Sequence, residues 1–151
     1  MSDQEYVKYL SRAMKWCSQA ERCRADVQEK LIKWGTPKIY YSRILYDLEQ
    51  ENFIDEARYA SAFVNDKFKF NQWGRIKITH ALRSRSIPEA AIYEALGRID
   101  EEEYRELAYH LMQKKNEELD EEYNVRKQKL FRFMASRGFE TGIIFDLWER
   151  L

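Results

Sequence analysis

The stretch Asn52–Leu82, with the sequence NFIDEARYASAFVNDKFKFNQWGRIKITHAL, decides the fold of this chain. Asp55 has the short acidic side chain of a helix N-cap, and an apolar face follows it at helical spacing, through Ala60, Phe63 and Val64. The turn Asn-Gln-Trp-Gly ends that helix, and a second, basic and amphipathic helix follows the glycine. The stretch therefore predicts two successive helices joined by a short turn.

The same pattern recurs on both sides of this stretch. Leu31, Leu82 and Met134 are anchors spaced 51 and 52 residues apart, and an apolar residue stands four positions before each anchor. Ten residues after each anchor a further helical apolar face begins. A regular period of this kind is typical of repeat proteins. We expect an all-α fold of three tandem three-helix, helix-turn-helix-like repeats in an elongated, curved array, with units at residues 1–51, 52–99 and 100–151.

Each unit is expected to have a leading helix and then a helix–turn–helix pair. The leading helices are predicted at residues 3–17, 55–70 and 100 to about 122, and the polar end of the last one is expected to project into solvent or to fray. The turns within the pairs fall in register, at Gly35-Thr36-Pro37, Ser86-Ile87-Pro88 and Gly138-Phe139-Glu140. Gly35 is placed to end its helix in a left-handed conformation, and Thr36 to cap the next helix before a proline.

Basic and acidic residues number 26 each, so the net charge does not indicate a nucleic-acid binder. Their distribution is uneven, since residues 62–98 carry seven basic and three acidic residues, and residues 123–138 carry five basic and none acidic. In units two and three, the second helix carries basic residues at matching positions, which we expect on the exposed sides of these helices. This pattern predicts a surface for phosphate or for an acidic protein partner, with solubilising charge as the alternative, and the candidate residues are Arg75, Lys77, Arg83, Arg85, Lys127, Lys129, Arg132 and Arg137.

The helices that follow the internal turns are neutral to acidic, which argues against insertion into the major groove of duplex DNA. Phe70 and Trp73 lie in or beside the turn of the opening stretch. Two interpretations stay open for them, stacking on the bases of a single strand and packing across the seam between units one and two, and we favour packing.

No catalytic or cofactor motif is present, since phosphate loops, dinucleotide fingerprints and nucleophile elbows are all missing. His80 and His110 lie on different predicted helices, and Cys17 and Cys23 are expected as buried thiols rather than metal ligands or redox centres. No apolar run reaches the roughly 18 residues that a membrane span needs, and the N-terminus has no signal pattern. We therefore expect a cytoplasmic non-enzyme without cofactor, metal or membrane association.

The pieces FIDEARYASAFV, GRIKITHAL and RFMASRGF, in this order and spacing, resemble the RecX family, and the resemblance extends from about Ala13 to the end. Asn52 and Ser86 depart from the pattern, because the family often has glycine there. The resemblance implies a monomeric regulator that binds RecA filaments on single-stranded DNA and inhibits the recombinase and ATPase activity of RecA in DNA repair, recombination and the SOS response. Single-stranded DNA itself is a second candidate partner. The alternatives are a helical-repeat adaptor for another protein and an independent DNA-binding protein.

Overall fold

The computed structural model describes residues 3–151, and all regular structure in that range is helical. The first group of helices contains α1 (Asp3–Gln19), α2 (Arg24–Lys33), the short 3-10 helix η1 (Lys38–Tyr40) and α3 (Tyr41–Gln50). The second contains α4 (Glu56–Lys69), α5 (Arg75–Ser84) and α6 (Glu89–Gly97). The third contains α7 (Glu101–Glu118), α8 (Tyr123–Ser136) and α9 (Thr141–Trp148).

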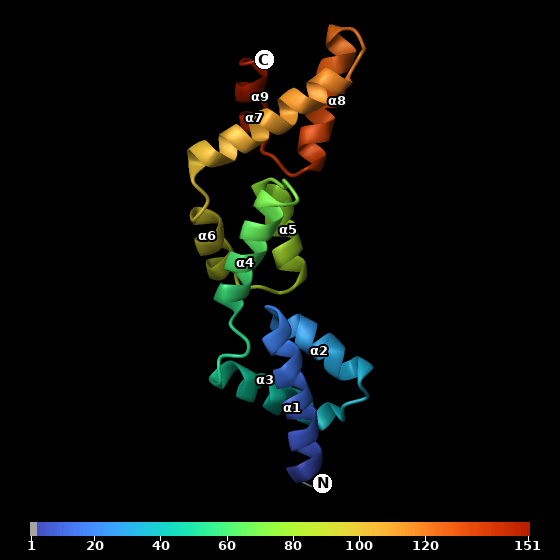
Figure 1. Ribbon diagram of the computed structural model, residues 1–151, viewed down its shortest axis with the longest axis vertical. Helices are drawn as coiled ribbons and strands as arrows, with labels where there is room; N and C mark the ends of the chain where they lie inside the picture. Colours follow the sequence, from blue (N-terminus) through green and yellow to red (C-terminus); the bar gives the residue numbers. More distant parts are fainter. Residues whose placement is uncertain (1–2) are drawn as a thin grey trace.

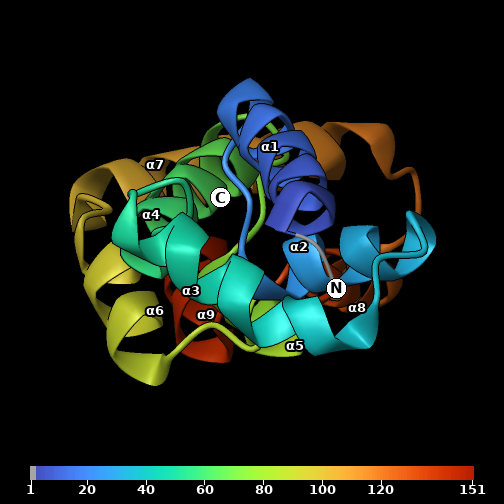
Figure 2. The same cartoon turned by 90° about the horizontal axis from the view of Figure 1, so that it is seen from below.

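The three groups follow one another along the long axis, with the two ends of the chain at opposite ends of the molecule (Figure 1). Viewed along that axis, the groups lie over one another (Figure 2). The expected all-α, elongated array is therefore confirmed. We propose that the groups are the units 1–51, 52–99 and 100–151, and we name the junction of α1–α3 with α4–α6 the first seam and that of α4–α6 with α7–α9 the second seam.

Acidic side chains begin the leading helices, as the sequence predicts. The Asp55 carboxylate accepts a hydrogen bond from the backbone N–H of Arg58 at 3.0 Å, and Asp100 caps α7 in the same way. The expectation that α7 continues to about residue 122 is wrong. It ends at Glu118, because Glu122 serves as the N-cap of α8 and accepts from the N–H of Val125.

The turns between the paired helices share one backbone geometry. Gly35, Ser86 and Gly138 have φ angles of 73°, 60° and 95°, so the left-handed turn predicted at Gly35 is confirmed and recurs in each group. The prediction that Thr36 caps a helix is wrong. Its hydroxyl is buried without a hydrogen-bond partner among the described residues, and Pro37 precedes η1 instead.

The core confirms the repeat anchors, because Leu31, Leu82 and Met134 are all completely buried. It divides into two clusters of buried side chains. One is confined to α1–α3 and the chain just after them, and the other runs continuously through α4–α9. The apolar face that begins ten residues after Met134 is expected to extend to Leu151, but Leu151 is exposed. The second seam is thus part of a common core, whereas the first seam lies between two cores, with Cys23 and Ala25 of group one packed into the core of α4–α9.

Candidate partner-binding surface

Two glycines bring α5 and α8 together at the second seam. The backbone N–H of Gly74 donates to the carbonyl of Arg137 at 2.7 Å, and the N–H of Ile76 donates to the carbonyl of Gly138 at 3.0 Å. A methyl group added at Gly74 would lie 2.5 Å from the backbone nitrogen of Phe139. The basic helix α5 is therefore fixed against the end of α8 by contacts that leave no room for a side chain.

Arg75 is bound inside this seam. Its guanidinium pairs with Glu140 at 2.8 Å and with Glu101, and it lies over the ring of Tyr104, 3.8 Å from the centroid. Tyr104 is completely buried and donates its hydroxyl hydrogen to Glu140, and burial followed by this hydrogen bond raises the pKa of the phenol. Arg75 therefore joins groups two and three, and the expectation that it lies on a free helix flank is wrong.

Arg85 has the corresponding position at the first seam. It pairs with Asp26, and its Nη1 lies 3.1 Å from Glu29, both on α2. Burial opposes the charge of Arg85, but the two carboxylates outweigh it and raise the pKa of the guanidinium. Arg85 therefore joins groups one and two rather than facing a partner.

Arg83 and Lys129 are paired within their own groups. Arg83 forms a two-point ion pair with Glu89, at 2.6 and 3.1 Å, and Lys129 pairs with Glu121. These hydrogen bonds lower the pKa of both carboxyl groups. Half of the eight predicted site residues thus already have a carboxylate partner within the chain.

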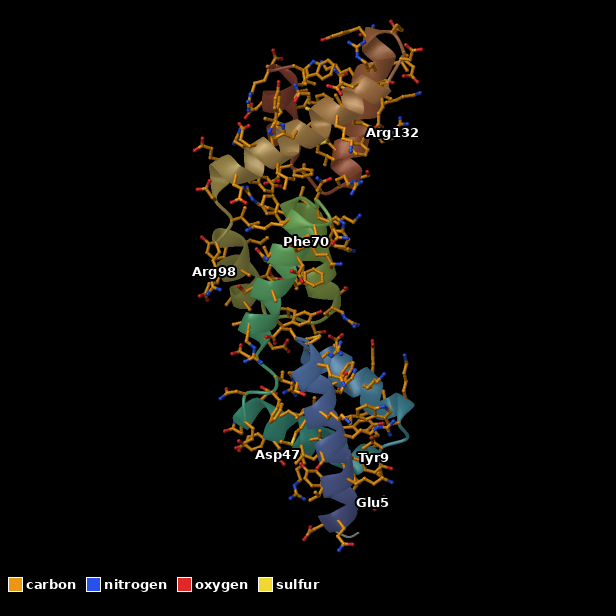
Figure 3. The ribbon with its side chains drawn as sticks, viewed as in Figure 1. Glu5, Tyr9, Asp47, Phe70, Arg98 and Arg132 are labelled. Carbon is orange, nitrogen blue, oxygen red and sulfur yellow. The ribbon has the colours of Figure 1, made fainter. Side chains whose placement is uncertain are left out.

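The other four candidate residues have no carboxylate partner among residues 3–151, and we call them the open cations: Lys77, Lys127, Arg132 and Arg137. They lie on α5, on α8 and at the C-cap of α8, and these two helices follow each other along one side of the array (Figure 1). Arg132 is exposed on the outer side of α8 (Figure 3). The structure therefore leaves half of the predicted basic residues without a carboxylate partner.

Aromatic rings lie beneath three of the open cations. Lys77 is 4.5 Å from the centroid of Trp73, and the guanidinium carbon of Arg137 is 5.4 Å from that of Phe133. Lys127 lies 5.6 Å from the centroid of Trp148. A cation held over a ring keeps its charge accessible while its stem is packed. Each of these three cations is therefore held over a ring while its charge remains available to a partner.

The packing predicted for Trp73 across the first seam is wrong. Trp73 packs edge-on against Phe63 of its own group, with centroids 6.4 Å apart, and the adjacent Gly74 lies at the second seam. Phe70, by contrast, is 79% exposed near the middle of the array (Figure 3). The turn of the opening stretch therefore presents one ring to solvent and uses the other as support for cations.

Two lysines were not among the sequence candidates. Lys114 and Lys115 line a small cavity of ≈ 310 Å³ together with Phe133 and Arg137, and Lys115 lies 5.0 Å from the Phe133 centroid. They precede an acidic run, so their local charge pattern resembles a solvated helix face. Only the approach of α7 to α8 places these lysines beside Arg137, and Lys115 also pairs with Glu118 at 3.6 Å.

Other classes of site find no support in the described part of the chain. Within residues 3–151, no helix is long and apolar enough to cross a membrane, and no three His, Cys, Asp or Glu side chains gather as a metal site would require. The candidate site is therefore the surface of open cations and rings.

Comparison with known proteins shows the family. The models for the second and third three-helix domains of RecX match residues 55–96 and 101–148. Regulatory protein RecX of Clostridium botulinum (strain Eklund 17B / Type B) is 32% identical over 145 residues, which cover 93% of this chain and 67% of that protein. The chain belongs to the RecX family.

Further RecX proteins agree in length and fold. Regulatory protein RecX of Prosthecochloris aestuarii is 26% identical over 151 residues, covering 100% of this chain and 98% of that protein. A crystal structure of regulatory protein RecX has a TM-score of 0.90 at 26% identity, and covers 96% of this chain and 73% of its own. RecX from Lactobacillus salivarius, 22% identical with a TM-score of 0.87 and coverage of 99% and 98%, shows the same fold. The RecX relatives are named as regulators, which places this chain in a family of regulatory proteins.

Proposed function

We propose that this protein regulates RecA, by binding RecA filaments on single-stranded DNA and inhibiting their recombinase and ATPase activity without catalysing a reaction of its own. Membership of the RecX family carries this proposal. The open cations on α5 and α8 support it, because positive charge without a carboxylate partner inside the chain suits a partner that presents carboxylates or phosphates.

The shape of the molecule supports a filament as the partner. An elongated array can contact several subunits of a polymer at once (Figure 1). Each contact can then be weak, because linked contacts raise the overall affinity through effective concentration. We propose that the open cations Lys77, Lys127, Arg132 and Arg137 make such contacts, and that Arg75, Arg83, Arg85 and Lys129 maintain the array that presents them.

Independent binding to duplex DNA is the weaker alternative. The helices that would enter a groove, α6 and α9, expose the carboxylates of Glu89, Glu94, Asp146 and Glu149, which phosphate repels. An adaptor for another protein would use the same open cations with a different acidic partner. The RecA regulator and the adaptor would therefore use the same surface and differ only in the protein that binds to it.

The decisive measurement is ATP hydrolysis by RecA on single-stranded DNA, with and without this protein. The proposal expects hydrolysis to fall as the protein is added, and binding to bare DNA to be much weaker than binding to the filament. Unchanged hydrolysis at saturating protein would contradict the regulatory function. Equal, strongly salt-dependent binding to bare DNA would favour the DNA-binding alternative.

The contact surface is tested by a charge reversal, Lys77→Glu with Lys127→Glu. The matched control is Lys8→Glu with Lys15→Glu on the exposed face of α1, which makes the same change in net charge. We expect the first pair to weaken inhibition at least tenfold, and the loss to shrink as salt rises because screening also weakens the parent interaction. Equal inhibition by both folded variants would remove the open cations from the interface.

A further inference from the structure

The two seams are held by different kinds of contact. The second seam has backbone hydrogen bonds between groups, the Gly74–Gly138 approach and a continuous core. At the first seam, no backbone-to-backbone hydrogen bond joins α1–α3 to α4–α6 in the described chain. Side-chain contacts with long, flexible arginines take their place there. The first seam is therefore the mechanically weaker junction of the array.

Two arginines of group two reach across the first seam. Arg85 binds Asp26 and Glu29 on α2, and Arg58 lies 2.7 Å from Glu21 just before α2. These ion pairs are partly exposed, so that dissolved salt can compete with them. These ion pairs act as a clamp that weakens as the salt concentration rises.

Clefts open on both sides of this clamp. One, of ≈ 420 Å³, is lined by residues that include Trp16, Tyr59 and Arg85. The other, of ≈ 380 Å³, is lined by residues that include Gln28, Glu56 and Arg85. A junction flanked by space on two sides can rotate without an immediate collision between packed side chains.

Glu56 adds an unfavourable contact to the closed junction. Its Oε2 is buried and has no hydrogen-bond partner among the described residues. Burial raises the pKa of this carboxyl group, and the neighbouring carboxylates of Asp26 and Asp55 act in the same direction, while a hydrogen bond from the backbone of Arg24 and the charge of that residue offset part of the rise. Opening of the seam would return this oxygen to water.

We propose that the first seam is a hinge, about which α1–α3 turn as one body relative to α4–α9, and that Arg85 and Arg58 form the clamp that holds the hinge closed. The chain crosses the seam through residues 51–55, where Asn52 takes a left-handed conformation with φ 61°. When the clamp opens, each side of the hinge keeps its own core, except that Cys23 leaves the core of α4–α9. The hinge changes the direction of one third of the array without unfolding either part.

The two cysteines report on this motion. Cys23 belongs to group one in sequence, but its side chain is completely buried in the core of α4–α9. Cys17 is buried in the separate core of α1–α3. Burial raises the pKa of each thiol to about 11, so their intrinsic reactivities are similar. Opening of the hinge would expose Cys23 and leave Cys17 protected.

The test is iodoacetamide labelling of the full chain at neutral pH, with the two cysteines resolved by peptide mass spectrometry. We expect Cys23 to react faster than Cys17, and its rate to rise with sodium chloride. Arg85→Gln should raise the Cys23 rate about twofold to fivefold, as the loss of a partly exposed ion pair allows, and should remove most of the salt dependence. The matched control is Arg83→Gln, which breaks an ion pair within group two and should leave both rates unchanged.

The salt series on the parent protein needs no substitution, so it decides the question even where a variant folds poorly. Equal labelling rates for Cys17 and Cys23 would mean that only global unfolding exposes them. A Cys23 rate that changes with neither salt nor Arg85→Gln would mean that the junction is rigid. Either result would overturn the hinge.

Discussion

At the scale of single residues, position 74 requires glycine because there is no room for a side chain, and not because of its backbone conformation. Its φ angle of −80° suits any amino acid. The constraint comes from α8, whose last turn lies so close that a methyl group on Gly74 would overlap the backbone around Gly138. The residue therefore transmits the position of group three directly to the start of α5.

Gly74→Ala should destabilise the protein by about 1–3 kcal/mol, because the second seam must move apart to admit the methyl group. The control is Gly142→Ala in α9, where the added methyl group meets nothing within 4 Å. That change should stabilise the protein by about 0.5–1 kcal/mol through its effect on helix propensity. Urea unfolding measures both, and similar effects in the two variants would refute the close approach.

At the scale of elements, the repeat register does not by itself decide how deeply a side chain is buried. The anchor Leu82 on α5 is completely buried in the core that α4–α9 share. Leu48 and Leu151 have the same register in groups one and three, but Leu48 on α3 is completely buried, whereas Leu151 follows α9 and is 39% exposed. A leucine at the end of the array therefore contributes less to stability than a leucine inside it.

Leu82→Ala should cost about 2–5 kcal/mol, since it leaves a cavity in the shared core. Leu151→Ala should change the free energy of unfolding by less than about 0.5 kcal/mol, as exposed positions do. Thermal or urea unfolding followed by circular dichroism measures the difference. A cost below about 0.5 kcal/mol for Leu82→Ala would show that the anchor assignment is wrong.

At the scale of the whole molecule, cooperativity should follow the two cores rather than the three groups. Phe68 of α4 stacks on Tyr104 of α7, with centroids 5.7 Å apart, and Tyr104 in turn contacts Phe139. These rings join groups two and three, and no comparable stack crosses the first seam within residues 3–151. Groups two and three should therefore fold as one unit.

A fragment of residues 52–151 should be helical and should unfold in a single transition, because it keeps the α4–α9 core except for the contribution of Cys23 and Ala25. A fragment of residues 1–99 should lose the structure of group two, because the cut uncovers Phe68 and the other side chains that α7–α9 bury. Circular dichroism melting distinguishes the two. If the fragment 1–99 kept the helical signal of group two and melted as cooperatively as the fragment 52–151, the shared core would be contradicted.

The sequence by itself determined the helices, their order and their anchors. Helical periodicity depends on residues three and four apart, and the left-handed turns depend on one position each, so both are visible in a local pattern. Leu31, Leu82 and Met134 are buried as predicted, and Gly35 and Ser86 occupy equivalent turns. The quoted pieces also sufficed to indicate the RecX family.

Only the tertiary structure decided which cations are free. Arg75 finds Glu140, and Arg85 finds Asp26, at sequence separations of 65 and 59 residues. No local pattern records these pairs, because they depend on how one group of helices stacks on the next. Electrostatic partners are set by distance in space, whereas helical faces are set by distance along the chain. For this reason the sequence predicted a basic surface of eight residues, whereas in the structure two of them pair across the seams, two pair within their own groups, and four are left without a carboxylate partner.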